Sequence, residues 1–249
     1  MTTLRVLTWN VLHRIHAENW AEHPVRRYPD ERVRQAALVA HVRARFDAGL
    51  DVACLQEASG DLVGALNSAL NDVAEIFAFR YPRVPRFRGP PPPPGARLVD
   101  PTEALVTLVA RGRGAGPGEA AAFADDAGKG YLAVESAGYL LVNSHVTFGD
   151  KAPGQLARLA SVAGRFPGPC VVTGDFNAPR ETIAGGLPPV FTPALAPEGS
   201  PPTRPRTASS KSQDIDHVFV RGARPGPAEV TDVAGLSDHN PVACELHLP

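Results

Sequence analysis

The segment at residues 170–177 reads CVVTGDFN, in which a short apolar run leads directly into a polar turn. Cys170–Thr173 has the β-branched, apolar character of a buried strand, and Asp175 and Asn177 follow at its end. Polar residues that end a buried strand lie at the rim of a sheet, where α/β proteins place their sites. The segment therefore predicts a buried strand with candidate site residues at its tip.

The same arrangement recurs along the chain. Leu4–Trp9 is a predicted strand that ends at Asn10, and Asp51–Gln56 is a predicted strand that ends at Glu57. Each of these polar residues ends a buried strand and is therefore expected at the rim of a sheet, so together they form the set of candidate site residues. The full set is Asn10, Glu57, Asn143, His145, Asp175, Asn177, Asp216, Asp238 and His239.

Apolar spacing and turn signals predict the remaining elements. Helical spacing favours helices over Asp30–Phe46, Gly60–Leu70 and Gln155–Ala163. Further strands are predicted over 72–79, 104–110, 130–135, 139–145, 214–220, about 228–233 and 242–248, with a turn at Ser136–Gly138. Proline-rich loops are predicted near 80–102, which contains PPPPP at 90–94, and near 187–212. This order predicts an α/β fold with mixed sheets in a single domain over 1–249.

Composition excludes several classes of protein. Of the 249 residues, 43% are hydrophobic and 20% are charged, which excludes a disordered chain. The 25 basic and 26 acidic residues leave a net charge of −1, so no overall field draws the chain to nucleic acid or to an anionic membrane. Lysine is scarce: the only lysines are Lys129, Lys151 and Lys211, and the other basic residues are arginines.

Cysteine usage and hydropathy predict the compartment. Cys54, Cys170 and Cys244 form no CxxC pair and lie in apolar runs, which favours buried free thiols in a reducing compartment. No apolar stretch approaches the 18 residues that a membrane span needs, and the N-terminal residues do not resemble a secretion signal. We therefore expect a soluble, cytoplasmic protein.

The donor atoms at the strand tips indicate the chemistry. They are carboxylate, amide and imidazole groups, without a thiolate pair or a GxSxG serine motif. Hard oxygen ligands suit Mg²⁺ or Mn²⁺, and Mg²⁺ typically binds through one or two carboxylates together with substrate phosphate oxygens. The set therefore favours metal-assisted hydrolysis of a phosphate ester by water.

Six strings at these tips resemble the endonuclease/exonuclease/phosphatase superfamily. They are TWN (8–10), LQE (55–57), VNSH (142–145), GDFN (174–177), DIDH (214–217) and SDHNPV (237–242). GDFN or SDH alone would be a weak signal, whereas six strings in order over nearly the whole chain are strong. The resemblance implies a four-layer α/β/β/α sandwich of two mixed sheets flanked by helices, with the site at one rim.

The resemblance also implies roles for the matched residues. Glu57 would be the principal ligand of the Mg²⁺ or Mn²⁺ ion, helped by Asn10 and Asp238. Asp175 and Asn177 would orient or deprotonate the attacking water and hold a phosphate oxygen.

The histidine motifs complete the catalytic set that the resemblance implies. His239 would bind a phosphoryl oxygen, oriented by Asp216, while His145 would lie near the leaving group. Asn143 of the VNSH string joins the expected catalytic residues. Glu103 occupies the position where the deoxyribonuclease-like branch has a histidine partner.

Two arginine-rich stretches bear on the substrate. They comprise Arg80, Arg83, Arg86 and Arg88 with Tyr81 and Phe87 interleaved, and Arg204, Arg206 and Lys211. Basic residues among aromatics suit a single-stranded nucleic acid or a nucleotide, and Arg86, Arg88, Arg204 and Arg206 are the expected substrate-binding residues, with Glu103. The alternative is that both stretches are solvated, arginine-biased loops.

The leading hypothesis is a phosphodiesterase acting on RNA, DNA or a nucleotide. Two alternatives remain: a phosphomonoesterase or terminal 2′,3′-cyclic phosphate hydrolase acting on RNA or a small phosphorylated metabolite, and a non-catalytic binding module on the same fold.

Four other histidines have competing interpretations. His13, His16 and His23 could form a zinc site, since His13 and His16 have helical spacing, but solvated loop histidines are the favoured interpretation. His217 alternates to the face opposite Asp216, which favours a structural role.

Overall fold

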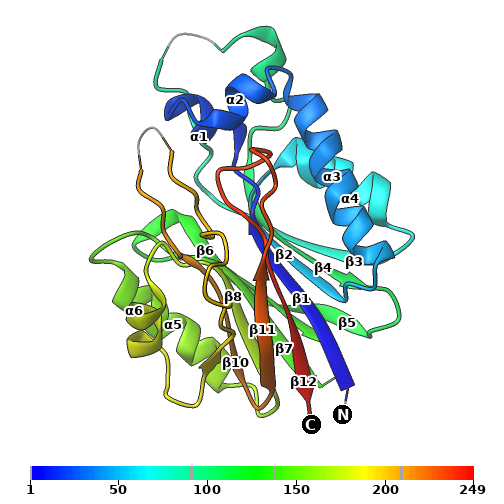
Figure 1. The fold of residues 1–249 in the computed structure, drawn as a ribbon, viewed down its shortest axis with the longest axis vertical. Coiled ribbons are helices and arrows are strands. Elements are labelled where there is room, and N and C mark those ends of the chain that lie inside the picture. The colour runs from blue at the N-terminus through cyan, green and yellow to red at the C-terminus, as the bar shows by residue number, and fades with distance from the viewer. Residues whose placement is uncertain (1, 90–91, 137, 208–209) are drawn as a thin grey trace.

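The computed structural model describes residues 2–89, 92–136, 138–207 and 210–249. Two six-stranded mixed sheets pack face to face, and helices cover both outer faces (Figure 1). Pro90 and Pro91 of the proline run, and Ala137 of the turn predicted after Ser136, lie outside the described residues.

Each sheet has a parallel pair of strands at its centre. The first sheet contains, in spatial order, β11 (Arg224–Val230), β12 (Val242–Leu248), β1 (Thr2–Asn10), β2 (Val52–Ser59), β4 (Glu103–Ala110) and β3 (Ala74–Arg80). The second contains β5 (Ala115–Phe123), β6 (Asp126–Ser136), β7 (Tyr139–His145), β8 (Cys170–Asp175), β10 (Asp216–Arg221) and β9 (Thr192–Pro193). The parallel pairs are β1–β2 and β7–β8, and the other pairings are antiparallel.

The helices divide into two outer layers and a separate group beyond the strand ends. They are α1 (Arg14–Asn19), α2 (His23–Arg27), α3 (Glu31–Asp47), α4 (Gly60–Leu70), α5 (Ala152–Gly164) and α6 (Arg180–Gly186), with a short 3₁₀ turn at Pro94–Ala96. In Figure 1, α3 and α4 cover the first sheet, α5 and α6 cover the second, and α1 and α2 lie past the ends of the strands. No helix in the described part of the chain is both long and apolar enough to cross a membrane.

Strand alternation explains the four layers. Along β1, Val6 faces the opposite sheet, whereas Leu7 and Trp9 pack with Leu38 and Leu62 of the covering helices. Because both faces of the central strands are buried, most of their residues are apolar, and the buried polar ones are hydrogen-bonded, as Gln56 is to Thr8 and Asn143. The predicted sandwich of two mixed sheets flanked by helices is confirmed.

Three strands differ from the sequence prediction, and one of them is the two-residue β9 inside the loop predicted near 187–212. Residues 115–123 were not predicted as a strand, because AGPGEAAAF has no β-branched residue, yet they form the edge strand β5. An edge position tolerates Pro117, whose missing N–H removes no bond from the interior of the sheet. The strand expected at about 228–233 instead spans Arg224–Val230, and its pairing with β12 is irregular between Pro225 and Ala228.

Candidate functional site

Four strand ends meet at one rim of the sandwich. Since β1 is parallel to β2 and β7 is parallel to β8, each pair directs its carboxyl ends the same way. Asn10 Nδ2 donates to Asp175 Oδ2 at 2.9 Å, so this bond joins the two sheets. His145 Nε2 lies 3.2 Å from Asp175 Oδ2 and 3.8 Å from Glu57 Oε1. Asn10 and Asp175, which are 165 positions apart in the sequence, therefore share one site.

A cleft of about 240 Å³ opens over these groups. Most of the predicted site residues line it: Asn10, Glu57, His145, Asp175, Asn177, Asp238 and His239.

An irregularity in β2 aims Glu57. Its pairing with β4 shifts register between Leu55 and Ala58, and Glu57 has a φ of 58°. A non-glycine residue in this left-handed region costs about 1–3 kcal/mol and persists only where its surroundings impose it. Glu57 Oε2 accepts the backbone N–H of His13 at 3.2 Å, which fixes the carboxylate toward the cleft. Burial alone would raise the pKa of Glu57, but His16 and Lys129 lower it well below the usual range of a carboxyl group.

Asp175 contacts several polar groups of the cleft. Besides Asn10 and His145, it accepts the backbone N–H of Asn177 on Oδ1 at 2.9 Å. Burial favours the protonated form, but the imidazoles of His145 and His239 lower the pKa of Asp175 far below its ordinary value. Asp175 is therefore an anion at neutral pH, surrounded by donors. Asn177 Nδ2 lies 3.2 Å from His145 Nε2.

His239 forms a buried pair with Asp216. Its Nδ1 lies 2.8 Å from Asp216 Oδ2, and its Nε2 lies 3.9 Å from Asp175 Oδ2. Burial disfavours the charged imidazole, but Asp216, Asp238 and Asp175 together raise the pKa of His239 to about 10. His239 is therefore a cationic hydrogen-bond donor at neutral pH.

The loop before β12 is anchored to β1. The Trp9 indole donates to the carbonyl of His239 at 2.9 Å. Ser237 Oγ donates to the Asn10 carbonyl at 2.7 Å and accepts the His239 N–H at 3.1 Å. These bonds fix His239 relative to Asn10.

Sequence reasoning missed Lys129. Its Nζ lies 2.6 Å from His145 Nε2 and 3.8 Å from Glu57 Oε1, on the wall of the cleft. The available signal was its rarity, because Lys129 is one of three lysines in an arginine-rich chain.

The arginines expected to bind substrate lie in different places. Arg88 and Arg204 line the cleft, and Arg204 Nη2 lies 3.0 Å from Asp238 Oδ2. Arg206 lines a separate cavity beside α2, and the backbone carbonyl of Arg86 accepts from the Asn19 side chain at 2.9 Å. Neither Arg86 nor Arg206 is among the residues that form the described cleft wall.

Asn143, which the sequence predicts to be catalytic, is not among the described residues that line the cleft. The side chain is fully buried between the sheets, where it accepts from Gln56 Nε2 at 2.8 Å and donates to Val106 O at 3.0 Å. An inward-facing position on β7, two residues before His145, places Asn143 below the rim and not at it. Asn143 is a structural cross-link between the sheets.

The N-terminal histidines were also misjudged. His13 is buried and caps α1 by accepting the N–H of Ile15 at 3.2 Å, and His16 lies in the cleft wall. The interpretation of both as solvated loop histidines is therefore wrong, whereas His23 is exposed. His217 lies on the outer face of β10, where its Nε2 is 3.1 Å from the Ala178 carbonyl and its ring packs near Phe176.

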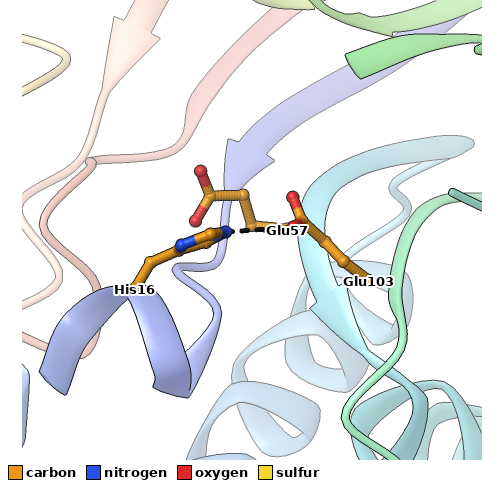
Figure 2. Close-up of side chains that lie close together, drawn as sticks. All are labelled: His16, Glu57 and Glu103. Carbon is orange, nitrogen blue, oxygen red and sulfur yellow. Dashed lines mark hydrogen bonds and ion pairs between the residues drawn. The ribbon is translucent and has the colours of Figure 1, made fainter. Parts of the chain in front are cut away.

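Glu103 pairs with His16 instead of His145. Its Oε2 lies 3.0 Å from His16 Nε2, and Figure 2 shows this pair beside Glu57. Two groups of described residues have donor atoms close enough to share a metal ion: His16, Glu57 and Glu103, and Asp175, Asp216 and His239. Asp238, an expected metal ligand, belongs to neither group, but its Oδ1 is buried without a hydrogen-bond partner among the described residues.

Comparison with known proteins places the chain in a family. The model of the endonuclease/exonuclease/phosphatase family matches residues 7–239, and the chain therefore belongs to this family of phosphoric ester hydrolases. A comparison with curated proteins gave no match.

Solved structures share the fold at low sequence identity. An endonuclease/exonuclease/phosphatase from Bacteroides vulgatus is 18% identical with a TM-score of 0.70, covering 100% of both chains. D. rerio TDP2 complexed with a single-strand DNA product is 16% identical with a TM-score of 0.69, covering 99% of this chain and 100% of that one. ANGEL2, a 2′,3′-cyclic phosphatase in complex with adenosine-2′,3′-vanadate, is 14% identical with a TM-score of 0.67, covering 99% and 96%.

Proposed function

We propose that this member of the endonuclease/exonuclease/phosphatase family is a divalent-metal-dependent phosphodiesterase that hydrolyses a nucleic-acid or nucleotide phosphodiester with water. The observation that carries the proposal is the position of Asp175, an anionic carboxylate within 4 Å of two imidazoles at the floor of an open cleft. A base, a cationic donor and metal-binding carboxylates are the components that in-line hydrolysis of a phosphate ester requires.

The residues of the cleft divide this work between them. Asp175 accepts a proton from the attacking water, while Asn177 helps to hold the water or a phosphate oxygen. The His239 imidazolium donates to a phosphoryl oxygen and stabilises the charge that grows there, with Asp216 fixing its orientation. His145, with Lys129 next to it, places a donor on the side where the alkoxide leaves.

The donor set fits a hard divalent cation. Glu57 and Asn10 supply oxygen ligands, and Asp238 Oδ1, which has no hydrogen-bond partner among the described residues, is a buried acceptor of the kind that a cation satisfies. We assign the Mg²⁺ or Mn²⁺ ion to Glu57, assisted by Asn10 and Asp238. When bound, the ion neutralises charge on the phosphate oxygens.

The rim of the cleft favours a substrate with a base. Trp20 is 55% exposed and lines the cleft, and the Arg88 guanidinium lies 5.2 Å from the centre of its ring. An exposed indole beside arginine suits the stacking of an unpaired base, which supports single-stranded nucleic acid or a nucleotide as substrate. The likeness to ANGEL2 keeps a cyclic phosphate hydrolase as the second candidate.

Turnover tests this proposal. The protein is incubated with Mg²⁺ or Mn²⁺ and bis-p-nitrophenyl phosphate, single-stranded RNA and DNA oligonucleotides, and oligonucleotides ending in a 2′,3′-cyclic phosphate. Glu57→Gln and Asp175→Asn should each lower kcat by about 10²–10³-fold, because each removes a charge used in the transition state. Asp72→Asn, which changes an exposed carboxylate outside the cleft, is the matched control.

The products separate the two candidates. Shortened oligonucleotides indicate the phosphodiesterase, whereas opening of the terminal cyclic phosphate without chain cleavage indicates the cyclic phosphate hydrolase. Absence of turnover on every substrate, or equal rates for wild type and Asp175→Asn, would contradict the proposal.

A further inference from the structure

A second group of donors lies beside the cleft, built from residues to which the proposed mechanism gives no role except for Glu57. His16 comes from α1, Glu57 from β2 and Glu103 from the start of β4 (Figure 2). One donor atom from each residue lies within 4.8 Å of the other two, and His16 Nε2 is 3.0 Å from Glu103 Oε2. Three elements that are distant in sequence therefore direct an imidazole and two carboxylates to one place.

The hydrogen bonding of Glu103 is incomplete. Glu103 is only 2% exposed, and its Oε1 has no hydrogen-bond partner among the described residues. A buried acceptor without a partner costs about 1–3 kcal/mol, and more if the group is charged. A simple His16–Glu103 ion pair would use one oxygen and leave this cost unexplained.

His13 lies next to the group but cannot be a ligand itself. Its ring centre is 5.5 Å from that of His16, and its Nδ1 accepts the backbone N–H of Ile15. Because Nδ1 is an acceptor, the proton of the neutral ring is on Nε2, which is buried without a partner in the described part of the chain. This Nε2–H is a donor beside the group that no described residue accepts, and it is suited to an anion or a bound water.

The spacing of the His16 and Glu103 donors matches that of two ligands of one metal ion, and Glu57 has a donor atom within 4.8 Å of both. Two atoms bound to one cation at about 2.1 Å and at roughly right angles lie about 3 Å apart, which is the separation of the His16 and Glu103 donors. The second carboxylate, Glu57, supplies another ligand and compensates the charge of a dication. An imidazole nitrogen favours Mn²⁺, Fe²⁺, Co²⁺ or Zn²⁺ over Mg²⁺, which prefers oxygen ligands.

We propose that His16, Glu57 and Glu103 form a second divalent-metal site, selective for a transition metal, on the wall of the cleft. Glu57 is then shared with the ion assigned above, and the two sites otherwise use different residues. The second site needs His16 and Glu103, whereas the phosphodiesterase proposal needs Asp175 and His239. The two proposals can therefore fail separately.

Binding of Co²⁺ to the metal-free protein tests the site. Cobalt reports its ligands by visible absorption, so the titration needs no substrate, and it is carried out in excess Mg²⁺ to fill sites that take hard cations. Wild type should develop a Co²⁺ band that Mg²⁺ does not abolish. Glu103→Gln and His16→Gln should each weaken Co²⁺ binding by about 100-fold or more, because each removes a direct ligand. Asp175→Asn should retain the band.

A second readout identifies the nitrogen ligand. In long-range ¹H–¹⁵N spectra, addition of Zn²⁺ should shift the Nε2 resonance of His16 while its Nδ1 remains protonated. Circular dichroism of each metal-free variant confirms that it is folded; if Glu103→Gln does not fold, the His16→Gln titration and the wild-type ¹⁵N spectra decide.

The outcomes distinguish the two proposals. Equal Co²⁺ binding in wild type, His16→Gln and Glu103→Gln, or complete displacement of Co²⁺ by Mg²⁺, would overturn the second site. Co²⁺ binding that depends on His16 and Glu103 in a protein without phosphodiesterase turnover would uphold the site and overturn the proposed function. Turnover that depends on Asp175, with no Co²⁺ bound through Glu103, would uphold the proposed function and overturn the second metal site.

Discussion

At the scale of single residues, neighbouring groups determine whether a buried histidine is charged or neutral. His239 faces three carboxylates and is held as a cation, whereas His217, on the other face of the adjoining strand, contacts a carbonyl and aromatic rings. Burial lowers the pKa of His217, although its bond to Ala178 opposes this effect. The same residue type therefore has opposite charge tendencies on the two sides of the second sheet.

This contrast predicts an acid-dependent loss of stability at His217. A histidine whose folded pKa is below its unfolded value of about 6.5 stabilises the fold above that pH, and the contribution is lost as the pH falls through the folded pKa. His217→Phe should lower the free energy of unfolding by about 1 kcal/mol at pH 7.5, because it leaves the Ala178 carbonyl unpaired. As the pH falls from 7.5 to 5, the difference in the free energy of unfolding between wild type and variant should become smaller.

Urea unfolding at both pH values measures this difference, and the imidazole chemical shifts of wild type give the pKa of His217 directly. A difference that widens toward pH 5 would show that His217 is charged in the fold.

At the scale of elements, glycines mark where the backbone must come close to a neighbour. Gly174, in the GDFN string, has a φ of 146°, and a Cβ built there would lie 1.8 Å from the carbonyl oxygen of Ser144 on β7. The close approach of β7 and β8 brings His145 beside Asp175. Gly64 is exposed in the middle of α4, where a Cβ meets no atom within 4 Å.

Alanine at these two glycines should act in opposite directions. Gly174→Ala should destabilise the protein by about 3 kcal/mol or more, because the two strands must separate. Gly64→Ala should stabilise it by about 0.5–1 kcal/mol through helix propensity. Thermal unfolding of both variants against wild type measures the effects, and a Gly174→Ala variant as stable as wild type would contradict the predicted clash.

Most elements followed from local pattern, and the exceptions have physical causes. The helix at Gly60–Leu70 matches its prediction because a Ser59 cap and apolar spacing agree. The strand β5 was missed because small residues carry no strand signal and only pairing with β6 makes it a strand. The irregularity that directs Glu57 into the cleft arises from the pairing of β2 with β4. The LQE motif therefore identified Glu57 but could not predict its backbone geometry.

At the scale of the whole molecule, the two sheets are joined through a buried polar network. Gln56 Nε2 donates to Asn143 Oδ1 and lies 3.0 Å from Thr8 Oγ1, while the Asn143 amide reaches the Leu55 carbonyl at 3.2 Å. Because strand tips from both sheets build the cleft, this network fixes their relative position. The sequence motifs identified which tips meet, but contacts such as Lys129 with His145 depend on packing between strands.

Removal of the cross-link should affect the whole fold. Asn143→Ala should lower the free energy of unfolding by about 2–3 kcal/mol, since Gln56 loses its buried acceptor. Ser68→Ala, on the exposed side of α4, is the control and should change stability by less than about 0.5 kcal/mol. Urea unfolding measures both, and a loss of turnover at unchanged stability would instead favour a catalytic role for Asn143.

The neighbours of β1 have a consequence for biosynthesis. β1 pairs with β12 from Thr2–Leu248 to Thr8–Val242, so one side of the first strand is completed by the last. Until residues 242–248 have been synthesised, the edge of β1 that pairs with β12 remains unpaired. This edge can then pair with another chain and aggregate, or bind a chaperone. Asn10 ends β1 and His239 precedes β12, so a nascent chain cannot contain a finished cleft until residue 239 has been synthesised.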